Sequence, residues 1–206
     1  MKSIMVALLL AIVVMNMASL GHALPDDQSP AAMQKWFQHF PNAVPKLTKL
    51  HFFVHNIVNM ENPTSVPVAQ AESTATSPTN FGLVSVIDAP LTEEPNSKEI
   101  IGYVQGIFAP SSNEELSNLL SVNFVFTEGK YKGSTLSVLG RDPVAETYRE
   151  FPIIGGSGDF RMARGIGTSA ASSVNSTTKD DILVEMHFVF YRYVLPGFDS
   201  DSEGSR

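Results

Sequence analysis

From residue 47 onward the chain is built from short runs rich in β-branched and aromatic residues. Glycine, proline, asparagine and serine separate these runs, a pattern typical of strands joined by turns. The expected strands span 48–58, 66–71, 82–88, 100–108, 119–127, 134–141, 146–154, 160–170 and 181–195. No long segment repeats its apolar residues with the helical period of about 3.6. The pattern therefore favours an all-β fold of antiparallel strands with short connections, as in a closed barrel or a sandwich.

The first and last expected strands indicate which side chains face inward. Because side chains alternate along a strand, Phe52 and Asn56 share one face of the first strand, and His51 and His55 share the other. Asn56 is thus a polar side chain on an otherwise apolar face. The last strand, 181–195, is apolar on both faces. A barrel buries only its inner face, so we expect another subunit to cover this strand; cover by the N-terminal arm is the alternative.

The two ends of the chain differ from this β-rich part, which we expect to form one domain over 47–195. Residues 1–23 have a positive start, an apolar run too short to cross a bilayer, and small residues at their end, which predicts a signal peptide and secretion. Residues 24–46 contain several prolines and are expected to form an irregular arm, with at most a short helix near 31–39. The acidic tail, 196–206, is expected to be disordered.

The composition excludes several functional classes. The 206 residues include no cysteine, so thiol nucleophiles and thiolate metal sites are absent. The formal net charge is −7 without a basic stripe, and we expect no nucleic-acid partner. No later stretch approaches the roughly twenty apolar residues of a membrane span, so no membrane partner is expected. Asn175 begins an Asn-Ser-Thr sequon in the polar run 168–178, which we expect to be a glycosylated loop.

The sequence lacks the HExxH, GxSxG, P-loop and CxxC motifs of common catalytic sites, and we expect no cofactor. His51 and His55 stand four residues apart, a spacing that would pair metal ligands on a helix. In a strand the same spacing places them two steps apart on one face. We therefore expect ordinary surface or half-buried histidines and no metal site.

Asp142 and Arg149 are the candidate functional pair. Asp142 ends one expected strand at a proline turn, and Arg149 lies in the next, so an antiparallel hairpin can bring them together at one mouth of a barrel. Two interpretations stay open at this point. The pair is either a turn cap with a structural ion pair or the polar part of a cavity.

A series of motifs resembles plant dirigent proteins and covers nearly all of residues 47–194. In chain order the motifs are LHFFVHNI, NPTSV, FGLVSVIDAPLT, GYVQGIFA, NFVFTEGKYKGSTL, GRDPV, YRE, IIGGSGDFRMARG and MHFVFYRY. The resemblance implies an eight-stranded antiparallel barrel of the allene oxide cyclase type, assembled as a homotrimer. It also implies a cavity for phenoxy radicals or the quinone methides derived from them, with Asp142 and Arg149 among its polar groups.

The function implied by the resemblance is stereoselective coupling of phenoxy radicals in lignan-like phenylpropanoid synthesis, in the apoplast or cell wall. A separate laccase or peroxidase makes the radicals, so whether the protein is itself an enzyme stays open. Phe52 and Phe108 would stack the rings, Asp142 would protonate a quinone methide, and Arg149 would hold an oxygen. The alternatives are an enzyme that cyclises or dehydrates a phenolic, as in pterocarpan-forming relatives, and a non-catalytic wall or defence protein that binds phenolics.

The sequence departs from the family pattern at several positions. The usual His-Asp-Ile is His55-Asn56-Ile57 here, and Phe108 stands where tyrosine is common. Asn56 can donate and accept hydrogen bonds but cannot supply a proton. Any proton transfer therefore falls more heavily on Asp142. The missing acid weighs against the cyclising enzyme and would suit a non-catalytic protein whose site has decayed.

Overall fold

The computed structural model describes residues 29–58, 61–172 and 181–195. The predicted signal peptide, the Asn175 sequon and the predicted acidic tail lie outside these residues. The described elements begin with helix α2 (Pro30–His39) and a 3-10 turn, η1 (Phe40–Asn42). Two further 3-10 turns are η2 (Glu72–Thr76) and η3 (Gly158–Phe160). The nine strands are β1 (Val44–Ile57), β2 (Ser65–Gln70), β3 (Leu83–Thr92), β4 (Gly102–Pro110), β5 (Ser117–Phe126), β6 (Thr135–Pro143), β7 (Tyr148–Ser157), β8 (Arg164–Ser172) and β9 (Asp181–Val194).

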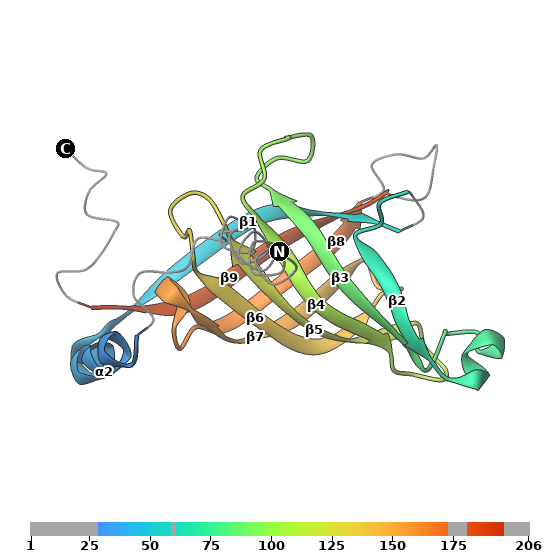
Figure 1. The fold of residues 1–206 in the computed structure, drawn as a ribbon, viewed down its shortest axis with the longest axis horizontal. Coiled ribbons are helices and arrows are strands. Elements are labelled where there is room, and N and C mark those ends of the chain that lie inside the picture. Colours follow the sequence, from blue (N-terminus) through green and yellow to red (C-terminus); the bar gives the residue numbers. More distant parts are fainter. Residues whose placement is uncertain (1–28, 59–60, 173–180, 196–206) are drawn as a thin grey trace, which may run out of the picture.

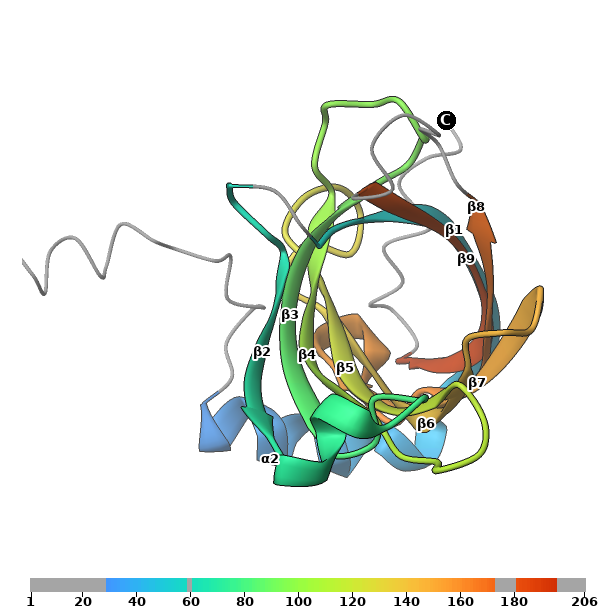
Figure 2. The same cartoon turned by 90° about the vertical axis from the view of Figure 1, so that its right-hand side faces the viewer.

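The strands form one antiparallel sheet in the order β1-β9-β8-β7-β6-β5-β4-β3-β2. Phe53 of β1 pairs with Thr92 of β3, and the next residue, Val54, pairs with Leu91, which closes eight strands into a barrel. The short strand β2 pairs with the other half of β3. Figure 1 shows the barrel from the side, and Figure 2 shows the ring of strands from one end. The all-β fold and the eight-stranded antiparallel barrel predicted from the sequence are confirmed.

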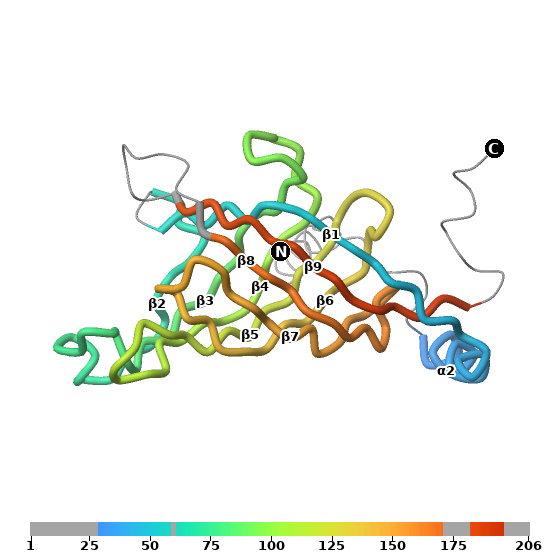
Figure 3. Tube along the Cα trace, turned by 180° about the vertical axis from the view of Figure 1, so that it is seen from behind, coloured from blue at the N-terminus to red at the C-terminus, as the bar shows by residue number. Residues whose placement is uncertain are grey.

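The first and last strands run side by side along their whole length, as the blue and red tubes in Figure 3 show. Their pairing extends from Val44 opposite Val194 to Ile57 opposite Asp181. Strand β1 therefore begins three positions earlier than the expected domain start at residue 47. The reason is that β9 continues to Val194 and offers the early residues of β1 a hydrogen-bonding edge.

Helix α2 occupies most of the described N-terminal arm. The hydroxyl of Ser29 accepts a hydrogen bond from the backbone N–H of Ala32 at 3.2 Å and so caps the helix, and Pro30 stands at its first position. Both features favour a helix start at this point. No helix among the described residues is long and apolar enough to cross a membrane.

Aromatic side chains fill the half of the barrel nearer to α2. The buried rings of this cluster are Phe52, Phe124, Phe126, Phe160, Phe188 and Phe190. The rings of Phe124 and Phe188 meet edge to face, with centroids 4.8 Å apart and an interplanar angle of 89°. A side chain on Gly167 would not fit, because its Cβ would lie 2.3 Å from the ring of Phe188. This aromatic cluster makes one half of the barrel a solid core.

Candidate functional site

The other half of the barrel contains a cavity of about 440 Å³. This volume is within the range of small-molecule binding sites. Most of its wall is aliphatic or aromatic, including Val104, Phe108, Leu120, Val122, Phe151 and Met186. Its polar side chains are Asn56, Ser65, Asn118, Asp142, Arg149 and Ser169. An apolar cavity with a few polar groups suits a ligand that combines hydrophobic rings with a small number of oxygens.

Four of these polar side chains come from four adjacent strands, β5 to β8. Asn118 is opposite Asp142 in the β5–β6 register, and Arg149 is opposite Ser169 in the β7–β8 register. Nη1 of Arg149 donates a hydrogen bond to Oδ1 of Asp142 at 2.9 Å, which joins the two pairs. We call Asn118, Asp142, Arg149 and Ser169 the polar arc. It forms a continuous polar strip on one side of the cavity wall.

The structure brings together the pair singled out from the sequence and places it inside the barrel. Asp142 and Arg149 are only 7% and 8% exposed. The guanidinium group is always charged and donates, so the Asp142 carboxyl group accepts through Oδ1 in a charge-assisted hydrogen bond. The two interpretations left open by the sequence thus describe the same side chains: they form an ion pair, and the ion pair lines the cavity.

Two atoms of the polar arc lack partners. Nε of Arg149 and Oγ of Ser169 are buried and make no hydrogen bond within the described residues. Buried polar atoms are nearly always paired, and leaving one unsatisfied costs about 1–3 kcal/mol. Arg149 and Ser169 are direct partners across β7 and β8 and both line the cavity, so the two atoms belong to the same part of its wall. The structure therefore indicates a polar anchor point for a ligand.

The other candidate residues divide into two groups. Asn56 and Phe108 line the cavity, as expected for binding residues. The amide oxygen of Asn56 accepts a hydrogen bond from the hydroxyl of Thr64 at 3.1 Å, so the amide N–H group is what Asn56 can offer to a ligand. Phe52 lies elsewhere, because four residues along a strand span roughly 13 Å. Phe52 belongs to the aromatic cluster in the half of the barrel nearer to α2 and is not among the residues that line the cavity.

Sequence reasoning missed Ser169. Position 169 fell where the expected strand 160–170 overlapped the polar run 168–178, which was interpreted as a loop, so no role was assigned to it; strand β8 continues to Ser172. Within β8, Gly167 and Ser169 are buried, whereas Ile166 between Gly165 and Gly167 is exposed. This alternation of small inward residues was the signal that could have placed Ser169 inside the barrel.

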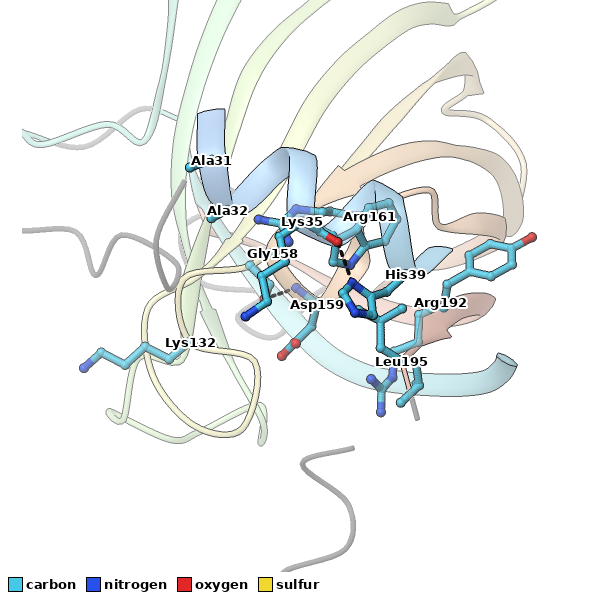
Figure 4. A pocket seen from close by; sticks show the side chains of 14 residues that line it. Ala31, Ala32, Lys35, His39, Lys132, Gly158, Asp159, Arg161, Arg192 and Leu195 are labelled. Atoms are coloured by element: carbon cyan, nitrogen blue, oxygen red, sulfur yellow. Dashed lines mark hydrogen bonds between the residues drawn. The ribbon is translucent and has the colours of Figure 1, made fainter. Parts of the chain in front are cut away.

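A second hollow, of about 580 Å³, lies outside the barrel between α2 and the end of β9 (Figure 4). Its basic side chains are Lys35, Lys132, Arg161 and Arg192. The guanidinium group of Arg161 lies over the ring of Trp36, 5.6 Å from its centroid, and Asp159 adds one carboxyl group. Among the described residues, both buried polar atoms without partners belong to the cavity inside the barrel. The inner cavity is therefore the better candidate site.

The family model described as Dirigent-like protein matches residues 47–191 of this chain. The chain belongs to the dirigent family. Dirigent protein 21 of Arabidopsis thaliana is 44% identical over 139 residues, which cover 67% of this chain and 74% of that relative. Pterocarpan synthase 1 of Glycyrrhiza echinata is 38% identical over 148 residues, covering 71% and 79%.

A solved structure extends the comparison to the fold. The pterocarpan synthase dirigent protein GePTS1 matches with a TM-score of 0.65 at 38% identity, over 75% of this chain and 92% of that one. The resemblance noted in the sequence is thereby confirmed, and the barrel of this chain is a dirigent barrel.

Proposed function

We propose that this dirigent-family protein binds a phenolic intermediate in the barrel cavity and directs the stereochemistry of its coupling. The observation that carries the proposal is the pair of unpartnered buried atoms, Arg149 Nε and Ser169 Oγ, in an otherwise apolar cavity. Phenoxy radicals and quinone methides present apolar rings with few oxygens. The polar arc offers fixed groups for an oxygen, and the apolar wall, including Phe108, buries the rings.

Such a role requires orientation and no redox group. A laccase or peroxidase removes one hydrogen atom from each phenol, and the two unpaired electrons then form the new bond. Secretion through the predicted signal peptide would bring the protein to the apoplast, where such oxidases would act. A difference of about 1.4 kcal/mol between two coupling faces already gives tenfold selectivity. Fixed reactant geometry is enough to produce a difference of this size.

The similarity to pterocarpan synthases favours a second candidate, ring closure on a quinone methide. That reaction needs a proton donor, and the carboxyl group in the cavity lining belongs to Asp142. Oδ1 of Asp142 accepts from Arg149, and Asn56 cannot supply a proton. We therefore place radical coupling first. A protein that only binds phenolics is the third candidate.

The deciding experiment combines the purified protein with a laccase and coniferyl alcohol, followed by chiral chromatography of the coupled product. We expect an enantiomeric excess that rises with the amount of protein, and no product without the oxidase. A parallel reaction supplies a quinone-methide precursor without an oxidase, and ring closure there would favour the second candidate. Racemic product in the first reaction and no ring closure in the second would contradict both directed reactions and leave only the binding protein.

The Asn56→Asp variant tests whether the cavity can perform proton transfer. We expect it to change the product distribution or to produce ring closure, because it restores a carboxyl group to the cavity wall. The new acid can lower stability by a few kcal/mol unless it stays protonated or paired, so the melting temperature is measured alongside.

The control for this substitution is Asn123→Asp on the exposed outer face of β5. If Asn56→Asp and the control give the same products from every phenolic tested, position 56 takes no part in the chemistry.

We also propose that the protein assembles as a homotrimer, as the family resemblance implies. Outward-facing side chains form an apolar row across neighbouring strands: Val66 is opposite Val86, and Val86 is opposite Ile107. The row continues through Ser121 to Leu139. Its apolar members are 36–43% exposed. A row of mostly apolar side chains on the outside of a barrel supports cover by another subunit.

Light scattering on the purified protein should give about three times the monomer mass. Ile107→Glu places a charge within the apolar row and should dissociate or insolubilise the assembly, whereas Asn96→Glu in the exposed β3–β4 loop should not. Tyr191→Glu, on the outer face of the last strand where Tyr191 is 52% exposed, should also dissociate or insolubilise the protein if another subunit covers that part of the strand. A monomeric wild-type protein at micromolar concentration would refute the trimer.

A further inference from the structure

Two histidines and a glutamate meet on the outer surface of the barrel, on the face of β9 opposite to Met186 of the cavity wall. His51 of β1 and His187 of β9 are direct partners in the strand register. Their rings stack with centroids 4.4 Å apart and an interplanar angle of 17°. Glu185 lies two residues before His187 and so projects from the same face of β9. We call His51, Glu185 and His187 the His–Glu–His cluster.

Both imidazole rings contact the same carboxylate oxygen. Nε2 of His51 lies 2.8 Å from Oε1 of Glu185, and Nε2 of His187 lies 3.1 Å from that atom. One potential ligand atom from each residue lies within 4.8 Å of the other two. Ligands bound at about 2.0–2.2 Å in a tetrahedral zinc site are roughly 3.3–3.6 Å from one another. Small side-chain movements would therefore convert the hydrogen-bonded cluster into a three-ligand site.

The cluster is open to ions from solvent and chemically suited to them. The side chains of His51, Glu185 and His187 are 46%, 34% and 54% exposed. Two imidazole nitrogens and one carboxylate oxygen favour ions such as Zn²⁺ or Cu²⁺ over Mg²⁺ and Ca²⁺, which prefer oxygen ligands alone.

The sequence did not indicate this cluster, and we expected no metal site from it. His51 and His55 were weighed as a pair because of their spacing. Nε2 of His55 instead lies 2.8 Å from the hydroxyl of Thr92, on the strand that closes the barrel. The partner of His51 comes from the other end of the chain, because β1 and β9 are neighbours in the sheet.

We propose that His51, Glu185 and His187 bind one divalent transition-metal ion of the zinc type, with the fourth coordination position open to solvent. The ion links the first and last strands of the barrel near the middle of their 14-residue pairing. Since the two strands are adjacent only in the folded protein, the ion binds the native state preferentially and stabilises it by mass action. This proposal is independent of the reaction performed in the cavity.

The test is a calorimetric titration of tag-free protein with zinc chloride, and with magnesium chloride for comparison. We expect one zinc ion per chain, no saturable magnesium binding, and a melting temperature that rises with zinc concentration. His51→Ala and His187→Ala should each weaken zinc binding by about tenfold or more and abolish the thermal shift. His55→Ala is the matched control, since it removes a histidine from the same face of the same strand, and it should retain the wild-type affinity.

Circular dichroism confirms that each variant is folded, and Glu185→Gln provides a nearly isosteric substitution if an alanine variant fails to fold. Glu185→Gln should also weaken zinc binding, because it removes the negative charge. Absence of zinc binding to the wild-type protein would overturn the proposal. Wild-type affinity in the cluster variants would do the same, as it would place the ion elsewhere on the chain.

Discussion

Asp142→Asn is expected to abolish stereoselectivity and to lower the free energy of unfolding by about 3 kcal/mol. The amide keeps the shape of the side chain but removes the negative charge, so the buried guanidinium group of Arg149 loses its counter-charge. The hydrogen bond at 2.9 Å that orients Arg149 weakens, and Nε is no longer held in position for a ligand oxygen. Coupling itself should continue at the oxidase-limited rate and give racemic product. Chiral chromatography and urea unfolding measure the two effects separately.

A double variant separates the loss of function from the loss of stability. Asp142→Leu combined with Arg149→Met removes both charges, so no unpaired charge stays buried, and stability should recover to within about 1 kcal/mol of the wild type. Selectivity should stay lost because the polar anchor is gone. Arg141→Met supplies the control, because Arg141 lies on the exposed face of the same strand as Asp142 and forms a surface ion pair with Glu115. Breaking that surface pair should cost no more than about 1 kcal/mol and leave selectivity unchanged.

Arg149→Lys distinguishes charge from geometry. Lysine keeps the positive charge but lacks the planar guanidinium group and its Nε donor, so we expect selectivity to fall while stability changes less than in Asp142→Asn. Loss of stability without loss of selectivity would identify a purely structural ion pair. In that case Asp142→Asn and Arg149→Lys lower the melting temperature, and the folded protein that survives keeps its full enantiomeric excess.

The sequence predicted those parts of the fold that depend on local patterns. The nine strands were recognisable because alternation and turn residues act within a few positions. Asp142 and Arg149 were recognisable because a hairpin brings them together, seven residues apart in the chain. Closure of the barrel carries no such local signal. It depends on two register pairs between β1 and β3, which follow from the curvature of the whole sheet.

Depth within the barrel and long-range neighbours were also beyond the reach of the sequence. Alternation correctly placed Phe52 on the inner face. It could not show that Phe52 lies outside the cavity, because the position of a residue along the barrel axis depends on strand stagger. His51 and Glu185 are 134 positions apart, and their contact follows only from the pairing of the first and last strands. Each missed feature thus required a strand register that no single segment encodes.

Phe188→Ala is expected to lower the free energy of unfolding by about 3–5 kcal/mol, the largest single loss of stability that we expect in the barrel. Phe188 is fully buried, with ring centroids 5.2 Å from Phe52 and 4.8 Å from Phe124. Truncation removes the ring from the middle of these contacts and leaves a hole that the surrounding strands can close only in part. Urea or guanidinium unfolding measures the change.

The same substitution should also affect the cavity through Phe124. Phe124 lines the cavity and packs against Phe188. Loss of this contact lets the cavity wall at Phe124 move, which should reduce the enantiomeric excess of the folded variant. Val189→Ala is the control, because Val189 is the next residue in β9, faces outward and is 43% exposed. It should cost less than about 1 kcal/mol and leave selectivity intact. A small loss in Phe188→Ala, similar to that of the control, would show that the aromatic cluster does not support the barrel as described.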